Sequence, residues 1–328
     1  MHRIRNISVL AVAVAVIVLV DPSGARADTT DNWQHNRHHA HLLVSGLQGT
    51  IGSTVGPDGA LYIPESVTGT ITRVNPRNGH TTTFASGLPT RVGDLGGAMD
   101  VAFIHHTAYA LVTLVSPDVG GTSADGIYRI DGPNHVTLIA DIGAYSLAHP
   151  PATAFFVPTG VQYAMQPYRG GFLVTDGHHN RVLRVSLNGE ITEVIAFSDI
   201  VPTGLALRGH NVYLAQAGPV PHLPENGKIV TFTTRTPVAT EIASGAPLLV
   251  DVEFDRGHTL YALSQGHFTP GHPEGSPADP NTGALESVHR DGTMTPVVSG
   301  LNQPTSLEFI HGTAYIVTLN GEVWTVNS

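Results

Sequence analysis

The stretch from Val201 to Gly245 reads Pro202-Thr203-Gly204-Leu205-Ala206-Leu207, Val212-Tyr213-Leu214-Ala215, Gly227-Lys228-Ile229-Val230-Thr231-Phe232 and Glu241-Ile242-Ala243-Ser244-Gly245, with turns between the runs. Each run is short, rich in β-branched or aromatic residues, and bounded by Gly, Pro or Asn, which is the pattern of strands and turns. Four such strands joined by hairpins predict one antiparallel sheet. The fold then depends on how often this unit recurs.

The third strand of the unit is the easiest to find elsewhere. A similar run, opened by Gly, Asn or Asp, occurs at Gly69–Val74, Asp125–Ile130, Asn180–Val185, Gly227–Phe232, Gly283–Val288 and Gly321–Val326. The first two strands give the same count, because an aromatic residue follows a small or acidic residue at near-constant spacing. These pairs are Ser53/Tyr62, Asp100/Tyr109, Gly204/Tyr213, Asp251/Tyr261 and Ser306/Tyr315, and a stretched copy pairs Gly160 with Leu173. The chain therefore contains six copies.

The two ends of the repeat complement each other. The fourth strand ends in a Ser-Gly tag, which also occurs at Leu43-Val44-Ser45-Gly46-Leu47, where no sheet precedes it. The last copy stops at Ser328, directly after its third strand. A ring closed by the N-terminal strand accounts for both facts and removes the exposed sheet edges. The sequence therefore predicts an all-β, six-bladed β-propeller. A β-sandwich is the alternative for regularly spaced short strands, but it would not explain why a Ser-Gly tag stands near the N-terminus with no sheet before it.

The N-terminal segment has the features of an export signal. Arg3 and Arg5 precede an apolar run from Ile7 to Val20, and Ala25-Arg26-Ala27 is a small-x-small cleavage pattern. The apolar run is too short to span a bilayer as a helix. We expect residues 1–27 to be a signal peptide, 28–39 a polar, His-rich lead-in, and 40–328 one propeller domain. We expect the mature protein to be extracellular or periplasmic, without a membrane span.

The amino-acid composition limits the classes of partner that this protein can bind. The net charge is −10 and the chain has a single lysine, Lys228, which argues against nucleic acid because backbone neutralisation needs clustered cationic residues. The absence of cysteine excludes disulfides and cysteine nucleophiles. We expect a monomer that binds a small molecule or a cell-envelope partner.

Propeller geometry turns the repeat into a map of one face. The first strand of each blade lines the central channel and the second returns beside it, so the start of the first and the end of the second lie on the same face. The longest loops, 115–124, 144–158, 217–226 and 265–282, open there too, which marks it as the binding face. The residues predicted to bind ligand at this channel mouth are Glu65, Asp100, Asp176, Gln216, Asp251 and Gln265. Nearby loop histidines, His178, His179, His267 and His272, are predicted to be solvated.

Asp100 and Asp251 are the candidate metal ligands. They belong to the second and fifth copies, which lie opposite each other in a six-membered ring. A bound cation such as Ca²⁺ would relieve the repulsion between their carboxylates. The alternative is that each aspartate bonds to nearby backbone without any ion. Ca²⁺ is the one cofactor that the pattern indicates.

The sequence assigns no catalytic residues. It contains no Gly-x-Ser-x-Gly, His-Glu-x-x-His, Walker, Gly-x-Gly-x-x-Gly or EF-hand motif. Whether the protein is an enzyme is left open. Two interpretations remain: a binding or scaffold propeller, and a Ca²⁺-dependent hydrolase, lactonase or lyase that uses channel carboxylates.

Two resemblances agree with this map. The stretch from Gly171 to Val185, which contains Val174-Thr175-Asp176-Gly177-His178-His179-Asn180-Arg181-Val182, resembles an NHL-type blade. Together with Pro202-Thr203-Gly204-Leu205 and the Ser-Gly-Leu tags, residues 40–328 resemble the ScyD/ScyE family of exported propellers, which implies a protein outside the cytoplasm and supplies no catalytic residues. A more remote resemblance is to the Ca²⁺-dependent gluconolactonase superfamily, in which an Asn stands where this chain has Thr203.

Overall fold

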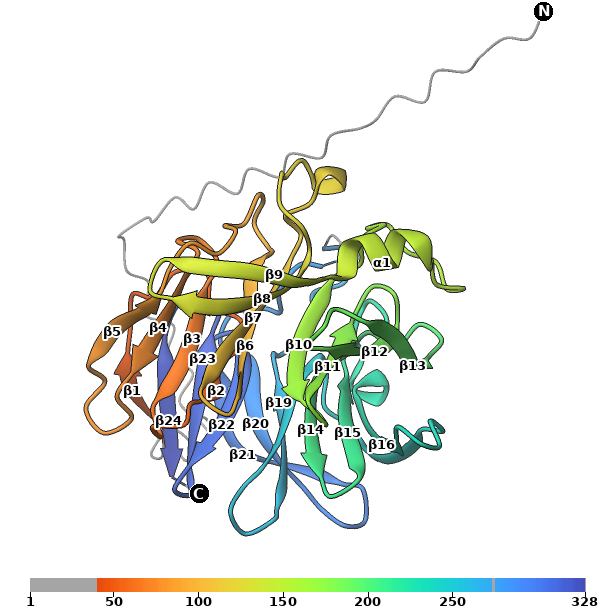
Figure 1. Cartoon of the computed structure of the whole chain (residues 1–328). Coiled ribbons are helices and arrows are strands. Elements are labelled where there is room, and N and C mark those ends of the chain that lie inside the picture. Colours follow the sequence, from red (N-terminus) through yellow and green to blue (C-terminus); the bar gives the residue numbers. More distant parts are fainter. Residues whose placement is uncertain (1–39, 273–274, 328) are drawn as a thin grey trace, which may run out of the picture. The chain divides into compact units, whose positions relative to one another are not determined.

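The computed structural model describes residues 40–272 and 275–327, and it confirms the six-bladed β-propeller (Figure 1). Six four-stranded antiparallel sheets follow one another along the chain. Blades 1 to 3 are β2 (Thr54–Val55), β3 (Leu61–Glu65), β4 (Thr70–Val74) and β5 (Thr81–Ala85); β6 (Gly97–Ile104), β7 (Thr107–Thr113), β8 (Gly126–Gly132) and β9 (His135–Asp141); and β10 (Gln162–Pro167), β11 (Gly171–Asp176), β12 (Arg181–Ser186) and β13 (Ile191–Ala196).

Blades 4 and 5 continue in the same order. They are β14 (Pro202–Arg208), β15 (Asn211–Gln216), β16 (Lys228–Thr233) and β17 (Thr240–Ser244), then β18 (Leu249–Phe254), β19 (Leu260–Ser264), β20 (Gly283–Val288) and β21 (Met294–Leu301). Blade 6 combines β22 (Pro304–Ile310), β23 (Thr313–Thr318) and β24 (Val323–Asn327) with β1 (Ala40–Val44). The predicted signal peptide lies outside the described residues.

The ring closes as the displaced tag predicted. β1 pairs antiparallel with β24, with Ala40 opposite Val326, and the Leu47 N–H donates to the Gly321 carbonyl at 3.1 Å. A Cβ at Gly321 would lie 1.8 Å from the Leu47 carbonyl oxygen. The close approach of third and fourth strands thus explains why a glycine opens the third strand here.

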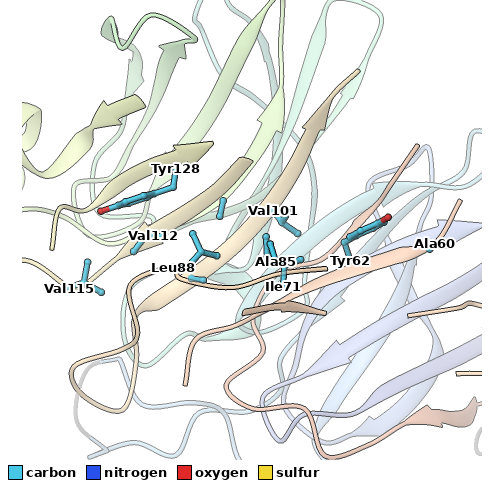
Figure 2. Packing of buried hydrophobic residues seen from close by; sticks show 11 residues of the cluster. Ala60, Tyr62, Ile71, Ala85, Leu88, Val101, Val112, Val115 and Tyr128 are labelled. Carbon is cyan, nitrogen blue, oxygen red and sulfur yellow. The ribbon is translucent and has the colours of Figure 1, made fainter. Parts of the chain in front are cut away.

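The hydrophobic core is divided among the six contacts between neighbouring blades. Figure 2 shows the cluster between blades 1 and 2, where Tyr62 and Ile71 meet Val101 and Val112. Tyr62 packs edge-on against Phe103 of the next inner strand, with ring centroids 4.8 Å apart. A second-strand tyrosine also contacts the phenylalanine of the next inner strand in the pairs Tyr213–Phe254, which is edge-on, and Tyr261–Phe309, which is tilted. The recurring aromatic of the second strand therefore ties each of these blades to its successor.

Loops after second and fourth strands gather on one side of the ring, which we call the loop-rich face. It carries α1 (Ile142–Ala148), directly after β9, and the short helices η2 (Pro117–Val119) and η3 (Pro224–Asn226). Figure 1 shows α1 towards the top of the view and the C-terminus at the opposite end. Across the two described ranges, no helix has the length and apolar character needed to cross a membrane.

Candidate functional site

The inner strands carry a β-bulge at the same depth in five of the six blades. Their pairing with the second strands shifts between Ala98 and Asp100, and correspondingly in β10, β14, β18 and β22. A bulge re-aims side chains, so that two successive residues of one strand line the channel. The channel wall is therefore layered. The first layer is Ile51, Met99, Tyr163, Thr203, Val250 and Thr305, and the second is Ser53, Asp100, Ala164, Gly204, Asp251 and Ser306. Ala164, and not the predicted Gly160, represents blade 3.

Tyr163 divides the channel into two compartments. It lines both hollows, and its hydroxyl donates to the Thr305 carbonyl at 3.2 Å. Because β10 and β22 belong to opposite blades, the side chain crosses the channel. We call the compartment towards the loop-rich face the apolar cup and the one beyond Tyr163 the acidic chamber.

The apolar cup has a volume of about 160 Å³. Ile51, Met99 and Val250 line it from the inner strands, and Leu114, Val201 and Leu248 line it from the loops. A cavity of about 150 Å³ with such a lining can hold a benzene-sized molecule. The cup is thus large enough for a small organic ligand.

Three of these cup residues, Leu114, Val201 and Leu248, have a positive φ. Val201 and Leu248 directly precede inner strands with φ of 48° and 44°, whereas Gly49, Gly96 and Gly160 have positive φ near the same point in blades 1 to 3. The conformation lets the Val201 carbonyl accept the Ala217 N–H at 2.9 Å. A left-handed residue other than glycine costs on the order of 1–3 kcal/mol, and such strain concentrates at functional sites. Here the strained conformation places three aliphatic side chains in the cup.

The acidic chamber contains the two aspartates predicted as metal ligands. Asp100 accepts the Val101 N–H at 2.8 Å and, through its other oxygen, the Met165 N–H of the next blade at 2.7 Å. Asp251 does the same with Val252 and Leu307, both at 2.8 Å. Each aspartate therefore links neighbouring inner strands. The motif glycine Gly204 leaves room for this, since a Cβ there would lie 2.2 Å from Asp251 Oδ1.

Two further carboxyl groups, Glu253 and Glu308, line the same chamber. Burial raises the pKa of Asp251 to about 7 and that of Glu253 to about 8. Burial and the neighbouring carboxylates hold the pKa of Glu308 well above its usual range, and burial together with the Asp251 charge does so for Asp100. No Lys, Arg or His lines the chamber within the described part of the chain. The chamber therefore binds protons more readily than isolated carboxyl groups would.

The carboxyl set does not fit Ca²⁺ as arranged. Calcium takes six to eight oxygen ligands at about 2.3–2.6 Å, whereas both oxygens of Asp100 and of Asp251 already accept backbone N–H groups. Residues 40–272 and 275–327 contain no group of three His, Asp or Glu side chains that could hold a metal ion. The chamber, at about 40 Å³, also has no room for an organic substrate.

The other predicted site residues are distributed differently. Gln265 lines the cup, and its Oε1 accepts the Ala278 N–H at 3.0 Å. Glu65 accepts the Gln48 N–H at 2.7 Å and bonds Thr72, so it anchors the segment that closes the ring. Gln216 is buried at the end of β15 and lines neither the cup nor the chamber.

Asp176 belongs to a buried network in blade 3. It accepts from Arg181, whose guanidinium also donates to the His149 carbonyl at 2.8 Å and to Ser146 Oγ at 2.9 Å. His179, predicted to be solvated, is 1% exposed and contacts the Val157 carbonyl and the Arg181 guanidinium, each at 3.0 Å. That prediction was wrong, because this network fixes α1 and the following loop to the blade.

Comparisons with known proteins identify the fold class and no closer relationship. No protein-family profile and no curated protein sequence matches this chain, so the resemblance to the ScyD/ScyE family stays a prediction. Solved structures with a similar architecture include a gluconolactonase from Xanthomonas campestris, with 13% identity, coverage of 88% of this chain and 89% of that chain, and a TM-score of 0.60.

A calcium-binding protein, regucalcin, from Agrobacterium tumefaciens has 13% identity, covers 87% of this chain and 92% of its own, and has a TM-score of 0.58. Virginiamycin B lyase from Staphylococcus aureus has 13% identity, coverage of 88% and 98%, and a TM-score of 0.54. At this level of identity the likeness establishes a common propeller fold.

Proposed function

We propose that this protein is an exported binding protein that holds a small apolar molecule in the apolar cup. The observation that carries the proposal is the cup itself: an apolar hollow at the channel mouth, closed below by Tyr163 and opening on the face that carries the long loops. Ligand sites are typically apolar hollows with few polar groups. Export rests on the N-terminal sequence pattern.

The surface around the cup supports this choice of face. Most of the large hydrophobic side chains exposed on the described residues belong to loops of the loop-rich face: Val67, Val92, Leu95, Leu147, Phe155, Phe156, Val220 and Leu223. The others, Leu42, Leu138, Leu187 and Val238, lie elsewhere. Apolar groups gathered on one face mark a binding surface, for a small ligand or for an envelope partner.

A matched pair of leucines tests the proposal. Leu95 lines the cup and is 40% exposed, whereas Leu187 is 38% exposed on a hairpin of the opposite face. An uncharged fluorescent probe, N-phenyl-1-naphthylamine, should bind the wild type, and Leu95→Glu should weaken binding about tenfold, equivalent to about 1.4 kcal/mol. Leu187→Glu should bind as the wild type does. The proposal fails if the probe does not bind or if the two variants behave alike.

The alternative function is a Ca²⁺-dependent hydrolase, lactonase or lyase. Its support is the fold shared with gluconolactonase-like and lyase-like propellers and the four carboxyl groups of the acidic chamber. We place it second because the hydrogen bonds of Asp100 and Asp251 and the small chamber volume argue against a metal-bound substrate there.

A further inference from the structure

A second hollow adjoins the apolar cup on the loop-rich face. We call it the aromatic notch; its volume is about 350 Å³, and Phe155 and Phe156 form part of its wall. Gly177, His178 and Val201 line both hollows. A ligand that occupies the cup can therefore extend past these shared residues into the notch.

His178 stands at this junction with an unsatisfied polar atom. Its Nδ1 is buried and has no hydrogen-bond partner among the described residues, while its ring packs against Phe156 with centroids 4.3 Å apart. Of the three such orphaned side-chain atoms, those of Thr153 and Asn302 line neither the cup nor the notch. A buried polar atom without a partner is costly and calls for an explanation.

The neighbouring histidine shows that the loop can satisfy such a group. His179 contacts the Val157 carbonyl and Arg181, as described above. His178, one residue earlier, turns towards the two hollows instead. Burial lowers the pKa of His178, so the ring is neutral at pH 7 and Nδ1 either accepts or donates according to its tautomer.

We propose that the cup and the notch together bind an uncharged, mainly apolar molecule that carries one hydroxyl group, which hydrogen-bonds to His178 Nδ1. A hydroxyl group both donates and accepts, so it satisfies either tautomer. An anion is disfavoured, because exposed Asp199 lines the outer part of the notch and no cationic Lys or Arg lines either hollow within the described ranges. This inference rests on the proposed function.

The test uses two probes that differ only in the hydroxyl group, naphthalene and 2-naphthol. The wild type should bind 2-naphthol about three- to tenfold more tightly, as expected for one hydrogen bond to an otherwise unpaired group. His178→Phe should bind both probes equally. His210→Phe, at an exposed hairpin of the opposite face, should keep the wild-type preference. Affinities are measured by probe fluorescence, and folding by circular dichroism.

The outcomes separate the two proposals. If neither probe binds the wild type, the proposed function fails. If both bind equally, or if His178→Phe keeps the preference, the apolar cup stands and the role of His178 is overturned. Should His178→Phe not fold, the ¹⁵N resonance of His178 Nδ1 in the wild type decides: it should shift with 2-naphthol and stay unchanged with naphthalene.

Discussion

The apolar cup and the acidic chamber are built from the same inner strands, one residue apart. Met99, Val250 and Thr305 line the cup, and their successors Asp100, Asp251 and Ser306 line the chamber. In an unbroken strand successive side chains point to opposite faces. The bulge in the inner strands brings both residues to the channel, and Tyr163 separates them into compartments of opposite character.

This contrast separates recognition from assembly. The cup has aliphatic walls and a volume that accepts a ligand. The chamber is small, and its aspartates are engaged in hydrogen bonds that tie blade 2 to blade 3 and blade 5 to blade 6. We infer that the two aspartates predicted from the sequence as metal ligands mainly hold the ring together. Four experiments test this division.

The largest effect is expected from opening the ring, on which both compartments depend. Deleting residues 1–48 removes β1 and the segment held by Glu65, which leaves β24 as a free edge. In a domain of this size, a loss of 1 kcal/mol in the free energy of unfolding lowers the melting temperature by only a few degrees. Because this deletion removes a whole strand and its anchor, we expect the melting temperature to fall by more than about 10 °C. Deleting residues 1–39 leaves β1 intact and serves as the control. Equal melting temperatures for the two deletions would contradict closure by β1.

Removing the partition comes next. Tyr163→Ala should destabilise the protein by about 3 kcal/mol, the lower end of the range for truncating a core aromatic to alanine, because Tyr163 is partly buried. It should also weaken binding of N-phenyl-1-naphthylamine, because the cup would then open onto carboxyl groups. Tyr163→Phe keeps the ring and loses only the bond to the Thr305 carbonyl, so about 1 kcal/mol is expected. Unchanged probe binding by Tyr163→Ala would show that Tyr163 is not the floor of the cup.

The chamber should make stability fall as the pH rises. Asp251 and Glu253 titrate in the folded protein at about 7 and 8, above their ordinary values of 3.8 and 4.5, so the folded state binds more protons than the unfolded chain. The stabilisation is complete below pH 4 and is lost as the pH passes through 7 to 8. We expect a melting temperature several degrees lower at pH 8 than at pH 5.

A double variant identifies the groups responsible for this pH dependence. Glu253→Gln with Glu308→Gln should flatten the dependence, leaving the part due to Asp100, Asp251 and Glu286, since burial raises the pKa of Glu286 to about 6. Glu190 is exposed on a hairpin, so Glu190→Gln should leave the pH dependence of stability unchanged. If stability were constant from pH 5 to 8 in the wild type, the chamber carboxylates would not hold protons.

Calcium should have the smallest effect. Stabilisation by a ligand grows only as RT ln(1 + [L]/Kd), so a site that does not fit Ca²⁺ should raise the melting temperature by less than about 1 °C at millimolar concentration. An increase of several degrees that is lost in Asp100→Asn with Asp251→Asn would instead favour the hydrolase interpretation and assign Ca²⁺ to the chamber.

The sequence determined the ring and its polarity. Strand periodicity, turn residues and the displaced Ser-Gly tag are local signals, and their repetition fixed the number of blades and the closing strand. Polarity followed from the order of strands, and Gln265 lines the cup on the loop-rich face, where it was expected. Asp100 and Asp251 were expected at the same channel mouth, whereas they lie beyond Tyr163 in the acidic chamber, because the bulge places them one layer deeper than Met99 and Val250. Glu65 was expected at the channel mouth too, yet its partners are Gln48 and Thr72.

Only the tertiary structure decided what the channel contains. The bulge that turns two successive residues inward has no residue pattern of its own, because Thr-Gly, Val-Asp and Tyr-Ala all accommodate it. The floor of the cup is the Tyr163 side chain, which a hydrogen bond holds to Thr305, 142 positions away in the sequence. Neighbouring His178 and His179 differ in the same way, since one meets Arg181 and the other faces the hollows. The Tyr163–Thr305 contact depends on how distant strands meet across the ring, which local sequence does not encode.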